Sequence, residues 1–260
     1  MFWGLSGMDK KPGKIMPKFG LLGRHISYSF SKAHFTKKFE KEDLPHTYEN
    51  FDMESITEFP NVIKDNPDLK GLNVTIPYKE QIMPYLNSID NTAKEIGAVN
   101  AITISASGHL KGYNTDCYGF KNSIQPLLKP HHKNALILGT GGASKAVAYV
   151  LMELGISYDY VSRTPNEIAK YRYSDLTSSI INSNLILINC SPVGTYPNIN
   201  ECPDIPYEGI TSKHLLYDLI YNPLQTKFLS IGASKGAIIC NGLKMLELQA
   251  EKAWNIWNNE

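Results

Sequence analysis

A lysine and an aspartate in the first half of the chain are candidates for acid–base chemistry. Lys79 closes the segment NVTIPYK at 73–79, and Asp116 closes the segment GYNTD at 112–116. Proline ends a central strand, so Lys79 is expected at the start of the next helix, where the helix dipole disfavours an ammonium group and eases proton loss. Paired across a cleft, Asp116 would orient this ammonium. A solvated lysine and a helix-capping aspartate are the alternatives for each residue alone.

Two serines follow the first apolar segment, at the point where the chain is expected to enter a helix. Ser29 and Ser31 flank a phenylalanine in the motif SFS. Hydroxyl groups placed there can bind the carboxylate of a ligand. The alternative is that one of them only caps the helix.

A glycine-rich segment in the second half is typical of a phosphate-binding turn. GTGGAS at 139–144 follows the apolar run ALIL and precedes a helical pattern. Gly139 permits a tight turn, Gly141 lets the backbone approach a pyrophosphate, and the free N–H groups of the helix start would hold the phosphates. Ser144 takes the place of the third glycine, which predicts slightly looser packing of helix on strand. Glycines also close ordinary strand–helix turns, so the motif alone is weak.

The end of the next expected strand favours NADP over NAD. NAD enzymes usually carry an Asp or Glu there for the ribose 2′-hydroxyl, whereas this chain has Ser162, Arg163 and Thr164. A guanidinium can pair with a 2′-phosphate and stack on adenine, and no carboxylate is present to repel the phosphate. The alternative is an ordinary surface arginine.

Alternating strands and helices must position these residues. In the first half we expect strands at 19–23, 72–76 and 98–104, helices at 32–40, 79–86 and 93–97, and a turn at 107–108 before a return strand. In the second half we expect strands at 135–138, 158–162, 185–189, 215–219 and 237–240, and helices at 122–128 and 145–154. This pattern predicts an α/β fold with right-handed parallel crossovers.

Two α/β domains and a returning C-terminal helix account for this order. We expect a substrate-binding catalytic domain at 16–115, a Rossmann-like NADP-binding domain at 116–239, and a helical segment at 240–260 that packs on the first domain. An apolar stripe from Leu243 to Trp257 supports that helix. Residues 1–15 are expected to be a disordered extension, an expression remnant or the result of an early start codon.

Composition narrows the class of protein. The formal net charge is +1, so no global field draws the chain to nucleic acid or to a membrane. The four cysteines form no CxxC pair and accompany no zinc-finger histidines, which predicts free thiols and no metal site. No segment is typical of a secretory signal or a membrane span. A cytoplasmic protein is expected.

Nine motifs in order resemble the shikimate dehydrogenase family from Met16 onward. They are SFS at 29–31, NVTIPYK at 73–79, GAVN at 97–100, GYNTD at 112–116, GTGGAS at 139–144, SRT at 162–164, NCSPVGT at 189–195, YDLIYNP at 217–223 and NGLKMLELQ at 241–249. Each motif alone is weak, but nine in the right order are specific.

The resemblance implies an NADP-dependent enzyme that reversibly reduces 3-dehydroshikimate to shikimate, in the shikimate pathway to chorismate and the aromatic amino acids. It implies Lys79 and Asp116 as the catalytic pair, without a metal, and a monomer or homodimer. The implied substrate-binding residues are Ser29, Ser31, Thr75, Asn100, Tyr217 and Gln249. The implied cofactor-binding residues are Gly139, Gly141, Gly142, Ala143, Ser144, Ser162, Arg163, Thr164, Gly242 and Met245.

The sequence departs from the family in three places, and two rival functions stay open. His25 and Tyr28 replace a proline and a histidine of the first turn, SRT replaces NRT, and Glu167 follows where a basic residue is usual. The last change predicts a less strict preference for NADP. The rivals are a quinate/shikimate dehydrogenase that uses NAD, and a cofactor-sensing protein without catalysis; both serines with Arg163 oppose the first, and Lys79 with Asp116 opposes the second.

Overall fold

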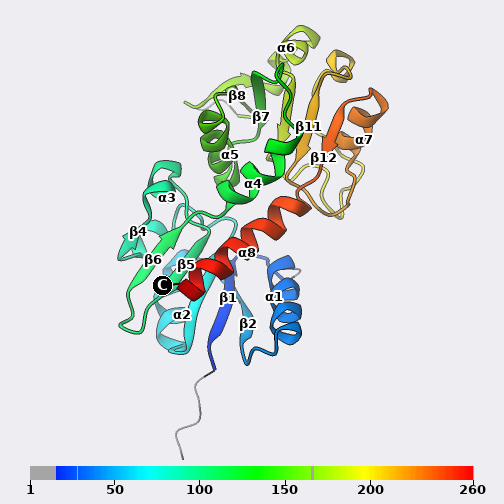
Figure 1. Ribbon diagram of the computed structural model, residues 1–260. Coiled ribbons are helices and arrows are strands. Elements are labelled where there is room, and N and C mark those ends of the chain that lie inside the picture. Colours follow the sequence, from blue (N-terminus) through cyan, green and yellow to red (C-terminus); the bar gives the residue numbers. More distant parts are fainter. Residues whose placement is uncertain (1–15, 28, 165–166, 260) are drawn as a thin grey trace, which may run out of the picture.

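The chain folds into two α/β halves, each built on a six-stranded sheet, with α8 passing between them (Figure 1). The computed structural model describes residues 16–27, 29–164 and 167–259. The extension expected at 1–15 lies outside the described residues. The α/β fold class predicted from the alternation of strands and helices is confirmed.

The first sheet is mixed, in the order β2-β1-β3-β5-β6-β4. Its strands are β1 (Lys18–Gly23), β2 (Thr47–Asp52), β3 (Leu69–Val74), β4 (Ser88–Ile89), β5 (Ala101–Ile104) and β6 (Leu110–Tyr113). β1 pairs in parallel with β2 and β3, whereas β5 is antiparallel to both β3 and β6. Gly108, at φ +79°, lies in the turn that joins β5 to the return strand, as the sequence predicts. The helices of this half are α1 (Phe30–Lys41), α2 (Phe59–Asp65) and α3 (Asn91–Ile96).

The second sheet is parallel throughout, in the order β12-β11-β10-β7-β8-β9. Its strands are β7 (Asn134–Leu138), β8 (Ser157–Ser162), β9 (Ala169–Arg172), β10 (Ile186–Asn189), β11 (Leu215–Asp218) and β12 (Ile238–Cys240). Its helices are α4 (Asp116–Ile124), α5 (Gly142–Glu153), α6 (Ser178–Ser183) and α7 (Lys227–Ser234). The central strands are buried apolar runs because helices cover both faces of such a sheet. This order places β7 and β10 side by side at the centre, where ligands bind in doubly wound folds.

Helix α8 (Leu243–Asn259) leaves the second half and lies across the first sheet (Figure 1). Trp257 fixes its far end: the indole Nε1 donates a hydrogen bond to the backbone carbonyl of Ile102 at 3.0 Å. The same indole lies where a Cβ at Gly71 would stand, so β3 needs glycine at this crossing. α8 thereby carries residues of the last motif to the first half.

The helix expected at 79–86 does not form. The chain makes turns after β3, followed only by a 3₁₀ turn, Met83–Tyr85. Pro77 precedes this stretch and Pro84 lies inside it, and a proline inside a helix interrupts its hydrogen bonding. Lys79 therefore does not begin a helix, and the helix-dipole argument for its reactivity is wrong.

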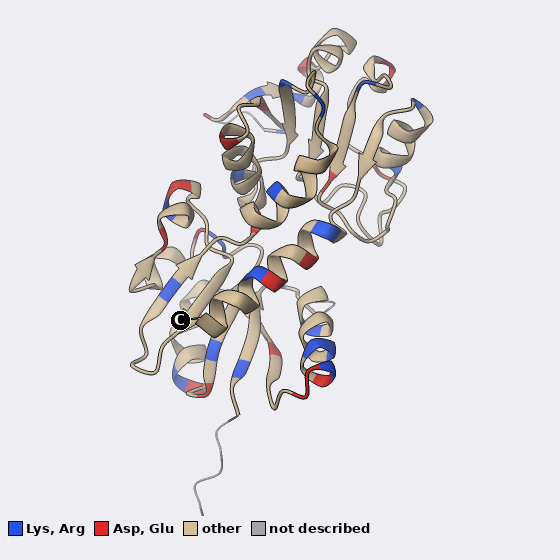
Figure 2. Cartoon of the chain, in the orientation of Figure 1, with Lys and Arg blue, Asp and Glu red and all other residues tan. Residues whose placement is uncertain are grey.

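Charged side chains of both signs are interspersed over both halves (Figure 2). Across the described ranges, no helix is long and apolar enough to cross a membrane. Nor do the placed residues contain a group of three or more His, Cys, Asp or Glu that could hold a metal ion.

Candidate active site

A cavity of about 270 Å³ lies in the first half, beneath α8, and we call it the serine cavity. It gathers six of the eight residues predicted for catalysis and substrate binding: Ser29, Ser31, Thr75, Lys79, Asn100 and Gln249. They come from the start of α1, the turns that follow β3, the loop before β5, and α8. Side chains distant in sequence thus surround one polar space.

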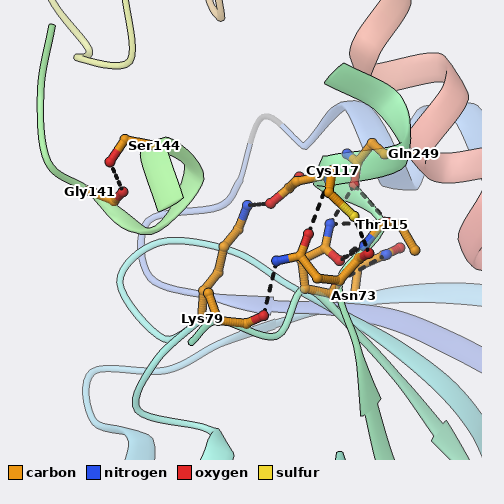
Figure 3. Close-up of polar contacts among 11 residues, drawn as sticks. Asn73, Lys79, Thr115, Cys117, Gly141, Ser144 and Gln249 are labelled. Atoms are coloured by element: carbon orange, nitrogen blue, oxygen red, sulfur yellow. Dashed lines mark hydrogen bonds and ion pairs between the residues drawn. The ribbon is translucent and has the colours of Figure 1, made fainter. Parts of the chain in front are cut away.

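Lys79 and Asp116 form an ion pair beside this cavity. Lys79 Nζ lies 2.6 Å from Asp116 Oδ2, and the side chains are 13% and 5% exposed (Figure 3). The backbone carbonyl of Lys79 also accepts a hydrogen bond from the N–H of Val99 at 2.7 Å, which fixes the turn that carries the lysine. Asp116 is the first residue of α4, and the contact found for its side chain is this ion pair, not a cap.

Three polar side chains form a connected network next to the ion pair (Figure 3). Asn100 Nδ2 donates to Gln249 Oε1 at 2.8 Å and to Thr115 Oγ1 at 3.1 Å. The backbone N–H of Thr115 donates to Asn100 Oδ1 at 2.6 Å. The network fixes the amides of Asn100 and Gln249 at the cavity wall, where they can meet hydroxyl groups of a ligand.

The two serines differ in what they already bind. Ser29 is the N-cap of α1, and its Oγ accepts a hydrogen bond from the N–H of Lys32 at 3.3 Å. Ser31 is 9% exposed and lines the cavity from the first turn of α1. The helix start adds a positive partial charge, so this end of the cavity suits an anion. Capping and cavity lining are therefore compatible roles for Ser29.

A second cavity, of about 620 Å³, opens at the carboxyl ends of the second sheet, and we call it the glycine-loop cavity. Of the predicted cofactor residues, Gly139, Gly141, Ser162 and Arg163 line it. Ile76 also lines it, whereas the adjacent Thr75 lines the serine cavity, so the two cavities adjoin. A cofactor in one can therefore face a substrate in the other.

The glycine loop fits a bound dinucleotide. Gly139 has φ +109°, a backbone conformation that favours glycine. A Cβ at Gly141 would meet open space, so the loop leaves room for a ligand at the start of α5. Ser144, in contrast, is fully buried and its hydroxyl donates to the carbonyl of Gly141 at 2.7 Å, which closes the turn from within. Gly142, Ala143 and Thr164 are not among the residues that line this cavity.

Tyr217 does not lie at the substrate cavity, and its predicted role is wrong. This tyrosine of β11 is 0% exposed and packs in the core of the second half, where its hydroxyl lies 2.7 Å from that of Ser123. Tyr221, four residues further along the same motif, lines the serine cavity. A residue inside a strand covered on both faces cannot reach a cavity at the end of the sheet, whereas one beyond the strand end can.

Gly242 and Met245 have packing roles in the structure. A Cβ at Gly242 would lie 2.0 Å from the carbonyl oxygen of Leu219, so the close approach of two backbones demands glycine there. Met245 is 6% exposed and belongs to the same core as Tyr217. Neither residue lines either of the two cavities.

Several residues that line the two cavities were not predicted from the sequence. His25 lines the serine cavity, and Tyr173, Cys190 and Asp204 line the glycine-loop cavity. Cys190 follows the end of β10, next to β7, so the strand order was the signal that could have placed it there. Burial raises the pKa of its thiol above the usual range, which keeps it protonated. Tyr28, the other departure in the first turn, lies outside the described residues.

The chain is similar in sequence to known proteins over most of its length. Residues 21–102 match a family model described as the shikimate dehydrogenase substrate binding domain. Over 259 residues the chain is 36% identical to the shikimate dehydrogenase (NADP(+)) of Methanosphaera stadtmanae, with 93% of this chain and 91% of the relative covered. It is 37% identical over 249 residues to that of Clostridium botulinum, with 92% and 95% covered.

Solved structures of two related enzymes superpose on 94% of this chain. The shikimate 5-dehydrogenase of Thermus thermophilus, crystallised with NADP(H) and shikimate, superposes with a TM-score of 0.83 at 30% identity, and 94% of each chain is covered. Shikimate dehydrogenase 1 of Peptoclostridium difficile superposes with a TM-score of 0.81 at 37% identity, covering 94% of this chain and 92% of that one.

Proposed function

The chain belongs to the shikimate dehydrogenase family, and from this premise we propose how its two cavities divide the reaction. The protein is an NADP-dependent oxidoreductase that interconverts 3-dehydroshikimate and shikimate. We assign the substrate to the serine cavity and the nicotinamide cofactor to the glycine-loop cavity. The two cavities adjoin at Thr75 and Ile76, so a cofactor in one can face a substrate in the other, and this supports the division.

The Lys79–Asp116 ion pair carries the mechanistic proposal. When bound, NADPH supplies the hydride that adds to the C3 carbonyl carbon of 3-dehydroshikimate. The Lys79 ammonium donates a proton to the developing alkoxide, and Asp116 holds the ammonium in place through the 2.6 Å contact. In the reverse direction the lysine accepts the proton of the shikimate hydroxyl. The side chains of Thr75, Asn100 and Gln249 are proposed to hold the ring hydroxyls.

Recognition of the substrate carboxylate is assigned to the start of α1. Ser29 and Ser31 present hydroxyl groups there, and the helix N-terminus favours an anion. Tyr221 is assigned the role that Tyr217 cannot fill, because it lies beyond the end of β11 and lines the serine cavity.

NADP binding is assigned to the glycine loop and to the end of β8. The backbone around Gly139 and Gly141 would hold the pyrophosphate at the start of α5, and Arg163 would pair with the 2′-phosphate. We further propose that the protein works in the cytoplasm as a monomer or homodimer, and its four free cysteines fit a reducing compartment.

The test follows NADPH absorbance with and without 3-dehydroshikimate. Loss of absorbance that requires the substrate supports the proposed function, whereas NADPH binding without turnover would indicate a cofactor sensor. Parallel assays of quinate with NAD and NADP test the other rival, and turnover of quinate with NAD exceeding that of shikimate with NADP would replace the proposed function.

A further inference from the structure

Asn189 and Asp218 are buried polar residues that end two neighbouring strands of the second sheet. Asn189 is the last residue of β10 and Asp218 is the last residue of β11, and the parallel register pairs the two directly. Both are 0% exposed, and neither lines the serine cavity or the glycine-loop cavity. Because both strands end here, the two side chains lie next to the loops that continue to the cavities.

The amide of Asn189 holds the loop that forms one wall of the glycine-loop cavity. Its Oδ1 accepts hydrogen bonds from the backbone N–H of Ser191 at 3.0 Å and from the Ser191 hydroxyl at 2.6 Å. Its Nδ2 donates to the carbonyl of Val193 at 3.3 Å. Ser191 and Val193 both line the cavity. A Cβ at Gly139 would lie 3.3 Å from the backbone nitrogen of Ser191, so this loop lies directly against the glycine loop.

The carboxyl group of Asp218 connects this loop to a segment of the other cavity. Its Oδ1 accepts hydrogen bonds from Asn189 Nδ2 at 3.0 Å and from the backbone N–H of Ile220 at 3.1 Å. The carbonyl of Ile220 accepts from the N–H of Gly242 at 3.0 Å, so both backbone groups of this residue are held. The next residue, Tyr221, lines the serine cavity. One carboxyl oxygen therefore joins a wall of the glycine-loop cavity to the segment that carries Tyr221.

Every hydrogen of this network has one acceptor. Asn189 uses both of its amide hydrogens and both lone pairs of its oxygen. Asp218 Oδ2 accepts the hydroxyl hydrogen of Thr226 at 2.6 Å, and Thr226, the N-cap of α7, accepts in turn from the N–H of Leu229. An apolar side chain in place of Asn189 or Asp218 would leave buried donors without a partner.

We propose that Asn189 and Asp218 are positioning residues for the two ligands of the reaction. The inference rests on the proposed assignment of the cofactor and the substrate to the two cavities. A loop that is already held in its binding geometry loses less conformational entropy when the ligand binds, so these bonds raise affinity without touching the ligand. The Asn189 amide serves the cofactor alone, whereas the Asp218 carboxyl group serves the cofactor and, through Ile220 and Tyr221, the substrate.

The test measures the KM for NADP and the KM for shikimate in variants of both residues. Asn189→Ala should raise the KM for NADP about 3- to 10-fold, the value of one ordinary hydrogen bond, and change the KM for shikimate less than twofold. Asp218→Ala should raise both KM values by about the same factor. Asp218→Asn keeps an oxygen that can accept from Asn189 and Ile220, so both KM values should stay within about twofold of wild type. An unchanged KM for NADP in Asn189→Ala, or an unchanged KM for shikimate in Asp218→Ala, would overturn the proposal.

His214 is the matched control for a general loss of stability. It is also 0% exposed and stands at the opposite end of β11, where its ring bonds the N–H of Thr211 at 3.0 Å and the carbonyl of Ile181 at 3.1 Å. His214→Ala should lower the free energy of unfolding in urea, as the other alanine variants do, but leave both KM values unchanged. Equal rises of KM in His214→Ala and Asp218→Ala would assign the effect to stability and overturn the proposal.

Two comparisons separate this inference from the assignment of the cavities. Asn189→Ala leaves the bonds of Asp218 to its other partners in place, so it decides the effect on the cofactor even if Asp218→Ala does not fold. If Arg163→Ala and Ser31→Ala leave the KM for NADP and the KM for shikimate unchanged, the assignment fails and this inference fails with it. If those two variants raise KM while Asn189→Ala and Asp218→Ala do not, this inference alone fails.

Discussion

Lys145, in the first turns of α5, reaches across to the first half and places its Nζ 2.7 Å from Glu80 Oε2, one residue after Lys79. This ion pair joins the turn that carries the proposed proton donor to the helix that begins at the glycine loop. A Cβ at Gly142 would lie 3.4 Å from Lys79 Cβ, so the two segments also touch directly. The relative position of the two cavities is thereby tied to the turn that carries the lysine.

We expect charge reversal at either end of this bridge to lower kcat/KM for shikimate by about 3- to 10-fold. The side chains of Lys145 and Glu80 are 30% and 47% exposed, so loss of the ion pair alone would cost little activity. Most of the expected loss comes from the repulsion between like charges in the single variants Glu80→Lys and Lys145→Glu. The double variant restores the attraction and should recover most of the activity. If kcat/KM of the double variant falls by the product of the two single-variant factors, the ion pair does not help to align the halves.

Lys79→Ala should lower kcat about 10²- to 10⁴-fold with a smaller effect on KM, because it removes a positioned proton donor. Steady-state kinetics in both directions measure this. Lys121→Ala, a lysine of α4 with a 38% exposed side chain in a weak pair with Glu153, is the control and should retain normal turnover. Near-normal turnover in Lys79→Ala would remove the lysine from the mechanism.

Sequence reasoning placed Lys79 at the site but for a reason that the structure does not support. The motif located the residue, whereas the helix expected at 79–86 was wrong. The carboxyl ends of neighbouring parallel strands meet at one edge, so Gly139 and Arg163 could be placed in one cavity from strand order alone.

Other contacts depend on packing that a linear pattern does not encode. Tyr217 and Tyr221 occupy one motif, and only the point where β11 ends decides which of them is free to face a ligand. The strand that carries Tyr48 mixes polar and apolar residues and was not expected at all, because an edge strand shows little apolar periodicity. The Tyr48 hydroxyl donates to Asn73 Oδ1 at 2.8 Å, and only the three-dimensional fold brings these two residues together.

The two serines should separate into different phenotypes. Ser31→Ala should raise the KM for shikimate about 10- to 100-fold, since it removes a hydrogen bond to a charged group worth about 1.5–3 kcal/mol. Ser29→Ala should raise KM and also lower the free energy of unfolding by about 1 kcal/mol, because it removes the N-cap of α1. Ser55→Ala, which removes the cap of a 3₁₀ turn in the same half, should affect stability alone. Unchanged KM in both serine variants would leave capping as their role.

Asp218 should make the protein less stable as pH rises from about 4 to about 6. Burial raises its pKa to about 6 from 3.8, although hydrogen bonds from Thr226, Ile220 and Asn189 oppose the shift. Between these values the folded state keeps a proton that the unfolded state has lost, so the free energy of unfolding falls with rising pH, by up to about 3 kcal/mol. Asp218→Asn should flatten this part of the profile in urea titrations at successive pH values. If the free energy of unfolding depends on pH in the same way in wild type and variant, the pKa of Asp218 is not raised by folding.

Arg163→Ala should raise the KM for NADP about 10- to 100-fold and leave the KM for NAD nearly unchanged. The side chain lines the glycine-loop cavity at the end of β8, where no carboxylate stands beside it in the SRT motif to reject a 2′-phosphate. A charge-assisted contact to that phosphate contributes about 1.5–3 kcal/mol, and NAD has no group to replace it. Arg172→Ala, an exposed arginine of β9 outside the cavity, is the control. Stacking on adenine would instead serve both cofactors, so equal rises in the two KM values would assign Arg163 to the adenine and leave discrimination to Thr164 and the backbone.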